Sequence, residues 1–361
     1  MRENLKKQSG ILAEELMAEL AAIPAGRRFS SVRGIQRKYR TNLRVVLAAL
    51  ERLKAAGEVE VIPQCGIFSN GRRFVKSVPT TMLILPEYPS PLYLQMMKNL
   101  DRRFRETGSM KLIKHFYNYE TESFSSISPE DCDIVAVVAP SRDLTRDELK
   151  MLVETEKPVL VLFKHFEELP LSSAAGNDIW NGIMAAEYLI ARGHVKLGVV
   201  ICEPRLFGIS AAAEAFRLTA EHNQAQCIEI DCSTVCGEYP EEKARARLAA
   251  YLAEHGTENF TALYVICGSA AKGVMVSLRE FGLETPRDVS IIGSGETPDC
   301  DYLRPPLTTV GVDIAEMSEK IAEMFLQLAE QPDRVFHATW LPEIHERDSV
   351  RAIENSLAPG K

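Results

Sequence analysis

Residues 81–361 repeat one pattern, in which a short and almost uninterrupted apolar run is followed by an amphipathic segment. The apolar runs lie at 82–85, 134–139, 158–163, 197–201, 262–266 and 289–292, with helical patterns between them, for example at 94–107, 182–192 and 272–281. Strands that are apolar along their whole length belong to parallel sheets covered by helices on both faces. This stretch is too long for one such core, so we predict two doubly wound α/β lobes, with a ligand site between them.

The composition fits a globular chain of several folded units. The chain has 361 residues, of which 46% are hydrophobic and 25% charged, which argues against a mainly disordered or fibrous protein. No apolar run approaches the ~20 residues that span a bilayer, and the polar residues 1–7 precede no apolar stretch. We therefore expect a cytoplasmic protein that does not engage a membrane and keeps its eight cysteines reduced.

The charge is distributed unevenly along the chain. Residues 1–76 carry 15 lysines and arginines against 7 aspartates and glutamates, whereas the remainder carries 27 against 43. A basic head on an acidic body suggests that only the head meets a polyanion, although a solvated basic face would have the same composition.

The head combines three helical patterns with a hairpin pattern. We expect helix starts at Ser9–Gly10, at Ser30 or Ser31, and at Thr41 or Asn42. Valines then alternate with glutamates at 59–61, and a turn at 63–66 precedes an apolar pair, which predicts a β-hairpin. This arrangement predicts a winged helix-turn-helix over 1–70, followed by a linker at 71–80.

A winged helix-turn-helix suits DNA. Its third helix fits a major groove roughly 12 Å wide, and Arg37, Lys38, Arg40 and Arg44 surround the start of that helix. These cations could neutralise phosphates. A small helical dimerisation domain is the alternative interpretation.

The head also contains a recognisable series of motif residues: Gly26, Ser31, Arg33, Val46, Ala49, Leu50, Leu53, Gly57, Gly66 and Phe68. In this order and spacing, the stretch 23–69 resembles the DNA-binding head of GntR-type regulators. The resemblance implies that Arg33 and the start of the third helix contact DNA, with the wing near Gly66 touching the backbone or minor groove. The chain departs from the family pattern at Asn42, Leu43, Arg44, Val45, Leu47 and Gln64, which leaves the sequence preference open.

Asn42 and Arg44 are our candidates for reading bases, because asparagine pairs well with adenine and arginine with guanine. Either side chain could instead hold only phosphates. The full set of expected DNA-contacting residues is Arg28, Arg33, Lys38, Arg40, Asn42, Arg44, Gln64 and Gly66.

Four segments of the body occur in the order of a second family. They are Tyr-Leu-Ile-Ala-Arg-Gly-His at 188–194, the stretch 282–293, Pro-Pro-Leu-Thr-Thr-Val at 305–310, and Glu-Arg-Asp-Ser at 346–349. They resemble signatures of LacI-type regulators, whose fold is that of periplasmic binding proteins. The resemblance implies two lobes joined by three crossovers, with lobe one at about 81–175 and 308–337 and lobe two at about 176–307 and 338–357. The whole chain is then similar to arabinose-repressor-like regulators.

The cleft departs from the sugar-binding pattern of that family. Ala212 stands where its ligand-gripping arginine is expected, Gly268-Ser269 replaces an Asn-Asp pair, and Gly176 replaces an aspartate. Loss of these hydrogen-bonding groups makes a common sugar a less favoured effector than in most relatives. The expected cleft residues are Leu92, Tyr93, Ser141, Arg142, Trp180, Arg205, Ser269 and Glu296.

Two of these cleft residues have simpler alternative roles. Trp180 could stack on a ring of the effector or pack in the core. Arg205 could replace the missing arginine or be an ordinary surface arginine.

The sequence indicates a DNA-binding transcriptional regulator, expected to be a repressor, whose operator affinity responds to a small molecule between the lobes. Its expected partners are double-stranded operator DNA, a small-molecule effector (possible classes include a carbohydrate or a derivative) and a second copy in a homodimer.

We expect no cofactor and no metal, because Cys227, Cys232 and Cys236 lack zinc-site spacing. An enzyme is disfavoured because no nucleophile–base pair is visible. A binding protein that never touches DNA, or a body that only dimerises, remains an alternative.

Overall fold

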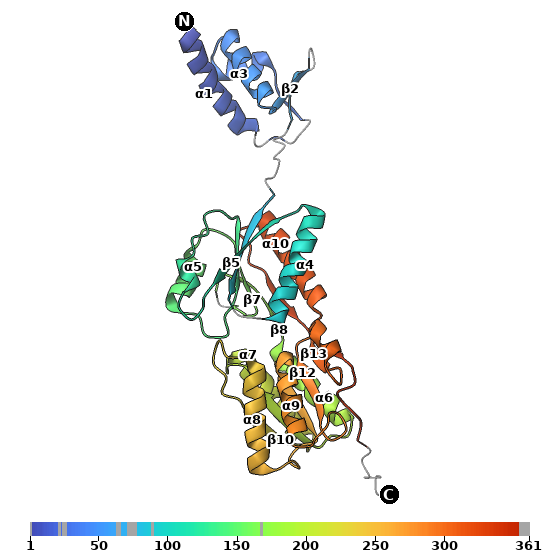
Figure 1. The fold of residues 1–361 in the computed structure, drawn as a ribbon. Helices are drawn as coiled ribbons and strands as arrows, with labels where there is room; N and C mark the ends of the chain where they lie inside the picture. Colours follow the sequence, from blue (N-terminus) through green and yellow to red (C-terminus); the bar gives the residue numbers. More distant parts are fainter. Residues whose placement is uncertain are drawn as a thin grey trace. The chain divides into compact units, whose positions relative to one another are not determined.

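The computed structural model describes residues 2–20, 23, 27–62, 66–70, 78–87, 90–166 and 169–353 (Figure 1). It forms two compact units, Met1–Val78 and Pro79–Lys361, here called the head and the body. The predicted linker falls largely on 71–77, outside the described residues. Among the helices that the structure describes, none is long and apolar enough to cross a membrane.

The head contains three helices and a three-stranded antiparallel sheet. Its elements are α1 (Arg2–Leu20), β1 (Arg28–Ser30), α2 (Val32–Tyr39), α3 (Leu43–Ala55), β2 (Val59–Ile62) and β3 (Gly66–Ser69). The hairpin β2–β3 is the predicted wing, and β1 adds to it in the order β1-β3-β2. One apolar core, including Leu16, Ile35, Val46 and Leu50, joins the helices to the sheet. The winged helix-turn-helix prediction is therefore confirmed.

The caps of α2 and α3 follow the predicted chemistry. The Ser31 hydroxyl accepts the Gly34 N–H, and the Asn42 carboxamide oxygen accepts the Val45 N–H at 3.0 Å, so both side chains satisfy free helix-end donors. The predicted start of α1 at Ser9–Gly10 is wrong, because the helix already begins at Arg2. Ser9 is buried instead of capping a helix end.

Lobe one of the body is a six-stranded parallel sheet in the order β14-β8-β7-β6-β4-β5. Its strands are β4 (Thr80–Pro86), β5 (Lys111–Tyr117), β6 (Ile134–Val138), β7 (Val159–Leu162), β8 (Ser172–Gly176) and β14 (His337–Trp340). Helices α4 (Pro91–Thr107) and α10 (Ile314–Glu330) pack over one face, and α5 (Arg146–Glu154) belongs to the other.

Lobe two is a second six-stranded sheet in the order β10-β9-β11-β12-β13-β15. Its strands are β9 (Lys196–Ile201), β10 (Gln226–Asp231), β11 (Ala262–Ile266), β12 (Ser290–Ser294), β13 (Thr308–Gly311) and β15 (Glu343–His345), of which only β15 runs antiparallel to its neighbour. Its helices are α6 (Asp178–Ala191), α7 (Phe207–His222), α8 (Pro240–His255) and α9 (Ala271–Glu280). Apolar cores fill both faces, so the predicted class, with two doubly wound lobes, is confirmed.

The chain crosses between the lobes three times. The crossings lie between β8 and α6, between β13 and α10, and between β14 and β15. The predicted return to lobe one at 308 comes too early, because β13 pairs in parallel with β12 and extends the sheet of lobe two. That return therefore lies after Gly311.

The signature residues of the body hold lobe two together. His194 is buried; its Nε2 donates to the Arg351 carbonyl at 3.1 Å and its Nδ1 accepts from the Thr261 hydroxyl at 2.9 Å. Burial lowers the pKa of His194, so the ring is held neutral. The Ser349 hydroxyl accepts the Thr308 N–H at 2.8 Å and donates to the Ile291 carbonyl. Both residues tie the last described segment to the sheet.

Candidate functional sites

The candidate nucleic-acid interface is the exposed face formed by α2 and the start of α3. Arg33, Arg40, Asn42 and Arg44 are all exposed there. Among the described residues, Arg33, Arg40 and Arg44 have no ion-pair partner, so their guanidinium groups are available to phosphates. Most of the cations that the sequence assigned to DNA are thus exposed on α2 and at the start of α3.

Lys38 differs from these three arginines. Its ammonium group pairs with the carboxylate of Glu19, to which the Tyr39 hydroxyl also donates. The hydrogen bonds from Lys38 and Tyr39 lower the pKa of Glu19, which keeps this carboxylate ionised. Lys38 therefore ties α2 to α1, a structural role that the sequence did not reveal.

The wing residues are only partly described. Gln64 lies outside the described residues, whereas Gly66 begins β3 with a φ of +126°, a conformation that favours glycine. A Cβ at Gly66 would lie 2.9 Å from Nε of Arg28, so the Arg28 side chain crosses directly over this glycine. Arg28 and Gly66 thus form one local unit at the base of the wing.

Two leucines on the same face of the head were not among the predicted contacts. Leu43 and Leu47 are 48% and 47% exposed on α3 and lie one helical turn apart. Asn42, by contrast, uses its carboxamide oxygen to cap α3. The exposed start of α3 therefore presents an apolar pair beside Arg44. The signal was visible in the sequence as two leucines outside the buried stripe.

The second candidate site is the carboxyl edge of the two sheets, where the lobes face each other. In lobe one, Tyr93 and Leu92 are half-buried beside the core. The ring of Tyr93 lies 5.3 Å from that of Phe163, which lies 6.3 Å from Trp340. Phe163 directly follows β7 and Trp340 is the last residue of β14; neither was predicted as a site residue. The indole nitrogen of Trp340 is buried without a hydrogen-bond partner among the described residues.

Arg142 and Ser141 also lie at this edge, but Arg142 is already engaged. Its guanidinium donates to both carboxylate oxygens of Glu148, at 2.8 and 2.7 Å, and Glu148 is fully buried. Ser141 contacts lobe two, since its backbone N–H donates to the sulfur of Cys236. The loop after β6 therefore touches the loop after β10, which brings the two lobes together.

In lobe two, three of the predicted cleft residues bind protein groups. Arg205 pairs with Glu229 and, at 2.6 Å, with Asp231. The Glu296 carboxylate accepts from Arg347 at 3.1 Å, and Ser269 interacts with the Cys267 thiol at 3.1 Å.

Trp180 is 46% exposed at the start of α6, so core packing does not account for it. Of the predicted residues in lobe two, Trp180 is the one whose side chain is most open to a ligand.

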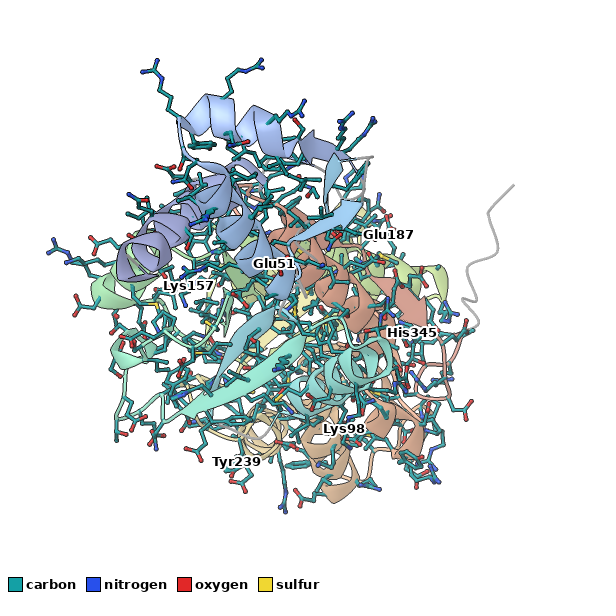
Figure 2. All side chains as sticks on the ribbon, turned by 90° about the horizontal axis from the view of Figure 1, so that it is seen from above. Glu51, Lys98, Lys157, Glu187, Tyr239 and His345 are labelled. Carbon is teal, nitrogen blue, oxygen red and sulfur yellow. The ribbon has the colours of Figure 1, made fainter. Side chains whose placement is uncertain are left out.

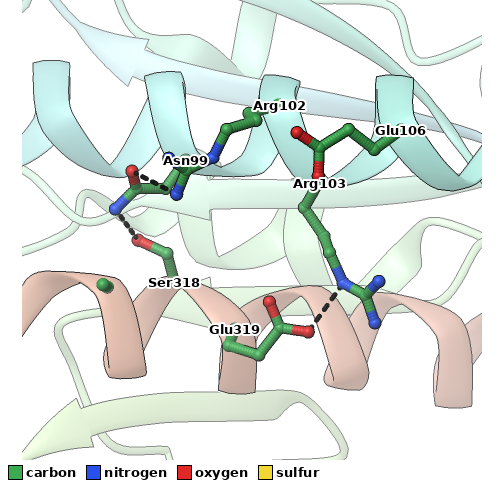
Figure 3. A pocket seen from close by; sticks show the side chains of 7 residues that line it. Asn99, Arg102, Arg103, Glu106, Ser318 and Glu319 are labelled. Atoms are coloured by element: carbon green, nitrogen blue, oxygen red, sulfur yellow. Dashed lines mark hydrogen bonds and ion pairs between the residues drawn. The ribbon is translucent and has the colours of Figure 1, made fainter.

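Two surface pockets lie away from the cleft. The first, of ≈ 330 Å³, lies between α4 and α10 and is lined by Asn99, Arg102, Arg103, Glu106, Ala315, Ser318 and Glu319 (Figure 3). An ion pair joins its two helices, since Nε of Arg103 lies 2.6 Å from a carboxylate oxygen of Glu319. The second lies at the amino end of β9, near Val195 and Phe260. Neither pocket involves the carboxyl edges of the sheets.

Within the described residues no group of three or more His, Cys, Asp or Glu side chains could hold a metal ion.

Comparison with known proteins agrees with this architecture. Residues 186–350 match the family model of a periplasmic binding protein-like domain. A LacI family transcriptional regulator from Enterococcus faecium, solved with bound ribose, superimposes with a TM-score of 0.64 at 20% identity, covering 76% of this chain and 100% of that one. The body has the periplasmic-binding-protein-like fold of LacI-type regulators.

Two curated relatives of this chain are transcriptional regulators by name. The HTH-type transcriptional repressor PurR of Vibrio atlanticus is 30% identical over 198 residues, which cover 51% of this chain and 55% of PurR. The chain thus spans about half the length of that relative. The HTH-type transcriptional regulator GalR of Escherichia coli is 25% identical over 294 residues, covering 78% of this chain and 82% of GalR.

Proposed function

We propose that the protein is a sequence-specific DNA-binding transcriptional regulator, expected to act as a repressor, whose operator affinity is changed by a small molecule bound between the lobes. The observation that carries this proposal is the exposed α2–α3 face of a winged helix-turn-helix, where Arg33, Arg40 and Arg44 have no ion-pair partner among the described residues. Similarity of the body to PurR and GalR, both transcriptional regulators by name, supports it. The wing formed by β2 and β3 supports a GntR-type head on this LacI-type body.

The α3 helix would enter the major groove with Arg44 at its first turn. Arg44 then reads a guanine edge, while Arg33 and Arg40 hold phosphates. Leu43 and Leu47 are the exposed apolar neighbours, and the apolar group that DNA offers in the major groove is the thymine methyl. We infer that the operator contains thymine at the positions that meet these leucines.

The body would pair two copies through α4 and the edge strand β5. On this face Leu94 is 56% exposed and Phe116 is 49% exposed, and an ion pair between Lys114 and Asp101 ties β5 to α4. Lys98, which Figure 2 labels, is another exposed residue of α4. An unpaired edge strand with exposed apolar side chains favours association with a second copy. Two heads would then match a pseudo-palindromic operator.

The effector would bind at the aromatic trio of lobe one. Tyr93 and Phe163 are half-buried and offer ring faces, whereas Trp340 is buried and supports Phe163 from the core. The carboxylate and guanidinium groups predicted for the cleft at Arg142 and Glu296 are neutralised within the protein. This favours a ligand with a flat or apolar face, a carbohydrate derivative included.

The primary experiment selects binding sites for the full chain from a random duplex library and then titrates the enriched site at several salt concentrations. Affinity should fall with log salt by a slope of about 0.9 per phosphate contacted. We expect Arg33→Ala to reduce that slope by about 1, and Arg44→Ala to cost about 1–3 kcal/mol at one base position. Lys150→Ala, an exposed cation on α5, is the matched control and should change neither. No enriched site, or binding that ignores salt, would contradict the proposal.

The thymine inference has its own test in the enriched site. Replacing a required thymine by uracil removes only the methyl group, so affinity should fall for the unmodified protein. The same replacement should have no further effect on a Leu43→Ala, Leu47→Ala double variant. Equal losses for both proteins would mean that the leucines do not meet the methyl groups.

Light scattering tests the pairing of two copies. Phe116→Asp should convert the dimer to a monomer, because a charge would be buried at the interface. Leu218→Asp, at an equally exposed leucine of α7 (50%), is the control and should remain dimeric. A monomer for the control alone would place the interface on α7.

Thermal-shift screening of a metabolite panel tests effector binding. A ligand at 100 times its dissociation constant stabilises the folded state by about 2.7 kcal/mol. Tyr93→Ala removes one half-buried ring face, so it should weaken effector binding while leaving operator binding without effector unchanged. A panel without any hit would favour a body that only dimerises.

A further inference from the structure

Three neighbouring strands of lobe two each end directly before a cysteine. Cys232 follows β10, Cys202 follows β9, and Cys267 follows β11, and these strands lie side by side in the order β10-β9-β11. In the sequence, β9 and β11 are apolar runs closed by Cys, whereas β10, with the sequence Gln-Cys-Ile-Glu-Ile-Asp, alternates polar and apolar residues before its Cys. The function proposed above does not use these thiols.

The register places Cys202 beside Cys232. Ile201 pairs with Asp231 in the parallel ladder, and the Cys232 N–H donates to the Ile201 carbonyl at 3.0 Å, so the pairing continues into the two cysteines. Neighbouring strands are about 4.8 Å apart. This lies within the Cα separations of roughly 4.4–6.8 Å that disulfides require.

The two thiols also point to the same side of the sheet. Both side chains belong to one core cluster, with Cys202 fully buried and Cys232 5% exposed. They hydrogen-bond to one another.

Cys232 is the less buried thiol of the pair, 5% exposed against 0% for Cys202, and we assign it the role of the attacking thiol. The hydrogen bond from Cys202 lowers the pKa of Cys232, and Arg247 and Lys243 of α8 act in the same direction. Arg247 is held in place because its Nε donates to the Asp231 carbonyl at 3.1 Å. Cys267 does not compete, since burial raises its pKa and its thiol interacts with Ser269.

We propose that Cys202 and Cys232 form a dithiol oxidation site for small hydroperoxides. The Cys232 thiolate attacks one peroxide oxygen, the O–O bond breaks, and the other oxygen leaves as water or an alcohol after taking a proton. The resulting sulfenic acid is attacked by the Cys202 sulfur; the S–S bond forms, the S–O bond breaks, and water leaves. Two thiols thereby lose two electrons, which reduce the peroxide.

The product would cross-link β9 and β10 at the edge that faces lobe one. Four residues beyond Cys232, the sulfur of Cys236 accepts the Ser141 N–H of lobe one. A disulfide therefore constrains the base of a loop through which the lobes meet. An effect on operator affinity rests on the proposed function, whereas the oxidation itself does not.

The test treats the reduced, folded full chain with a small excess of hydrogen peroxide and maps the peptides without reduction. We expect loss of two of the eight thiols, one Cys202–Cys232 cross-linked peptide, and full reversal by dithiothreitol. Cross-linking only after denaturation, or of another pair, would overturn the proposal. Because the readout is chemical, it succeeds or fails independently of DNA binding.

Two variants separate the roles of the cysteines. Cys202→Ser should leave Cys232 as a sulfenic acid that a dimedone probe labels, and Cys232→Ser should abolish both the label and the cross-link. Cys227→Ser, in the same strand β10, is the matched control and should form the cross-link as the unmodified protein does. Dimedone labelling of Cys227 and Cys232 to the same extent would show that no reactive pair exists.

Discussion

Replacing Arg142 by alanine would leave a buried carboxylate without its counter-charge. The fully buried Glu148 accepts two bonds from Arg142, at 2.8 and 2.7 Å, one from the Thr145 N–H at 2.8 Å, and one from the Ser123 hydroxyl at 3.2 Å. Removing one partner of a buried ion pair costs about 3–5 kcal/mol. The two remaining donors favour the lower end, about 3 kcal/mol, which corresponds to roughly 6–12 °C in the melting temperature.

The loss should depend on pH in a defined direction. Burial raises the pKa of Glu148, but the hydrogen bonds from Arg142 and Thr145 outweigh it, so the pKa lies below its ordinary value of 4.5. A lowered carboxyl pKa contributes stability above the unfolded-state pKa, and this contribution disappears as the pH falls through the folded-state pKa. The stability of the Arg142→Ala variant should therefore differ most from that of the unmodified protein at neutral pH, and least in acid below the folded-state pKa of Glu148.

Calorimetric melts of the full chain at pH 7 and at a series of lower pH values measure both effects. Arg217→Ala is the control, because Arg217 makes two helix-surface ion pairs, with Glu214 at 2.6 Å and Glu221 at 2.5 Å. Exposed pairs of this kind contribute at most about 1 kcal/mol. The reasoning is refuted if Arg142→Ala melts like Arg217→Ala. A normal melt with a lost effector response would instead restore Arg142 to the ligand site predicted from the sequence.

Two further substitutions probe the packing of lobe two. A Cβ at Gly182 would lie 2.1 Å from the Ala212 carbonyl oxygen, so Gly182→Ala should force α6 and α7 apart and lower the denaturation midpoint strongly. Gly176→Ala is the control and should be tolerated, because no atom of the described residues lies within 4 Å of a Cβ placed there. Ser349→Ala should cost about 1–3 kcal/mol in urea unfolding because the buried Thr308 N–H loses its acceptor; an unchanged midpoint for either variant would contradict the packing described here.

The long apolar runs predicted β4, β6, β7, β9, β11 and β12 because strands buried on both faces must be apolar along their whole length. The strands β5 and β8 were not predicted, for two different reasons. β5 is an edge strand of mixed polarity, and β8 is a run of small residues, Ser-Ser-Ala-Ala-Gly, buried between β7 and β14. Neither carries the periodicity that marks a strand locally.

By itself the sequence determined the local properties of the site: the basic head, the caps at Ser31 and Asn42, and the cations around α3. Only the tertiary structure decided which charges remain available. Arg205 lies 26 residues from Asp231, and Arg347 lies 51 residues from Glu296, yet each pair is joined in the fold. Helix spacing and capping depend on residues within one or two turns, whereas ion pairing depends on strand order, which brings distant residues to the same edge of a sheet.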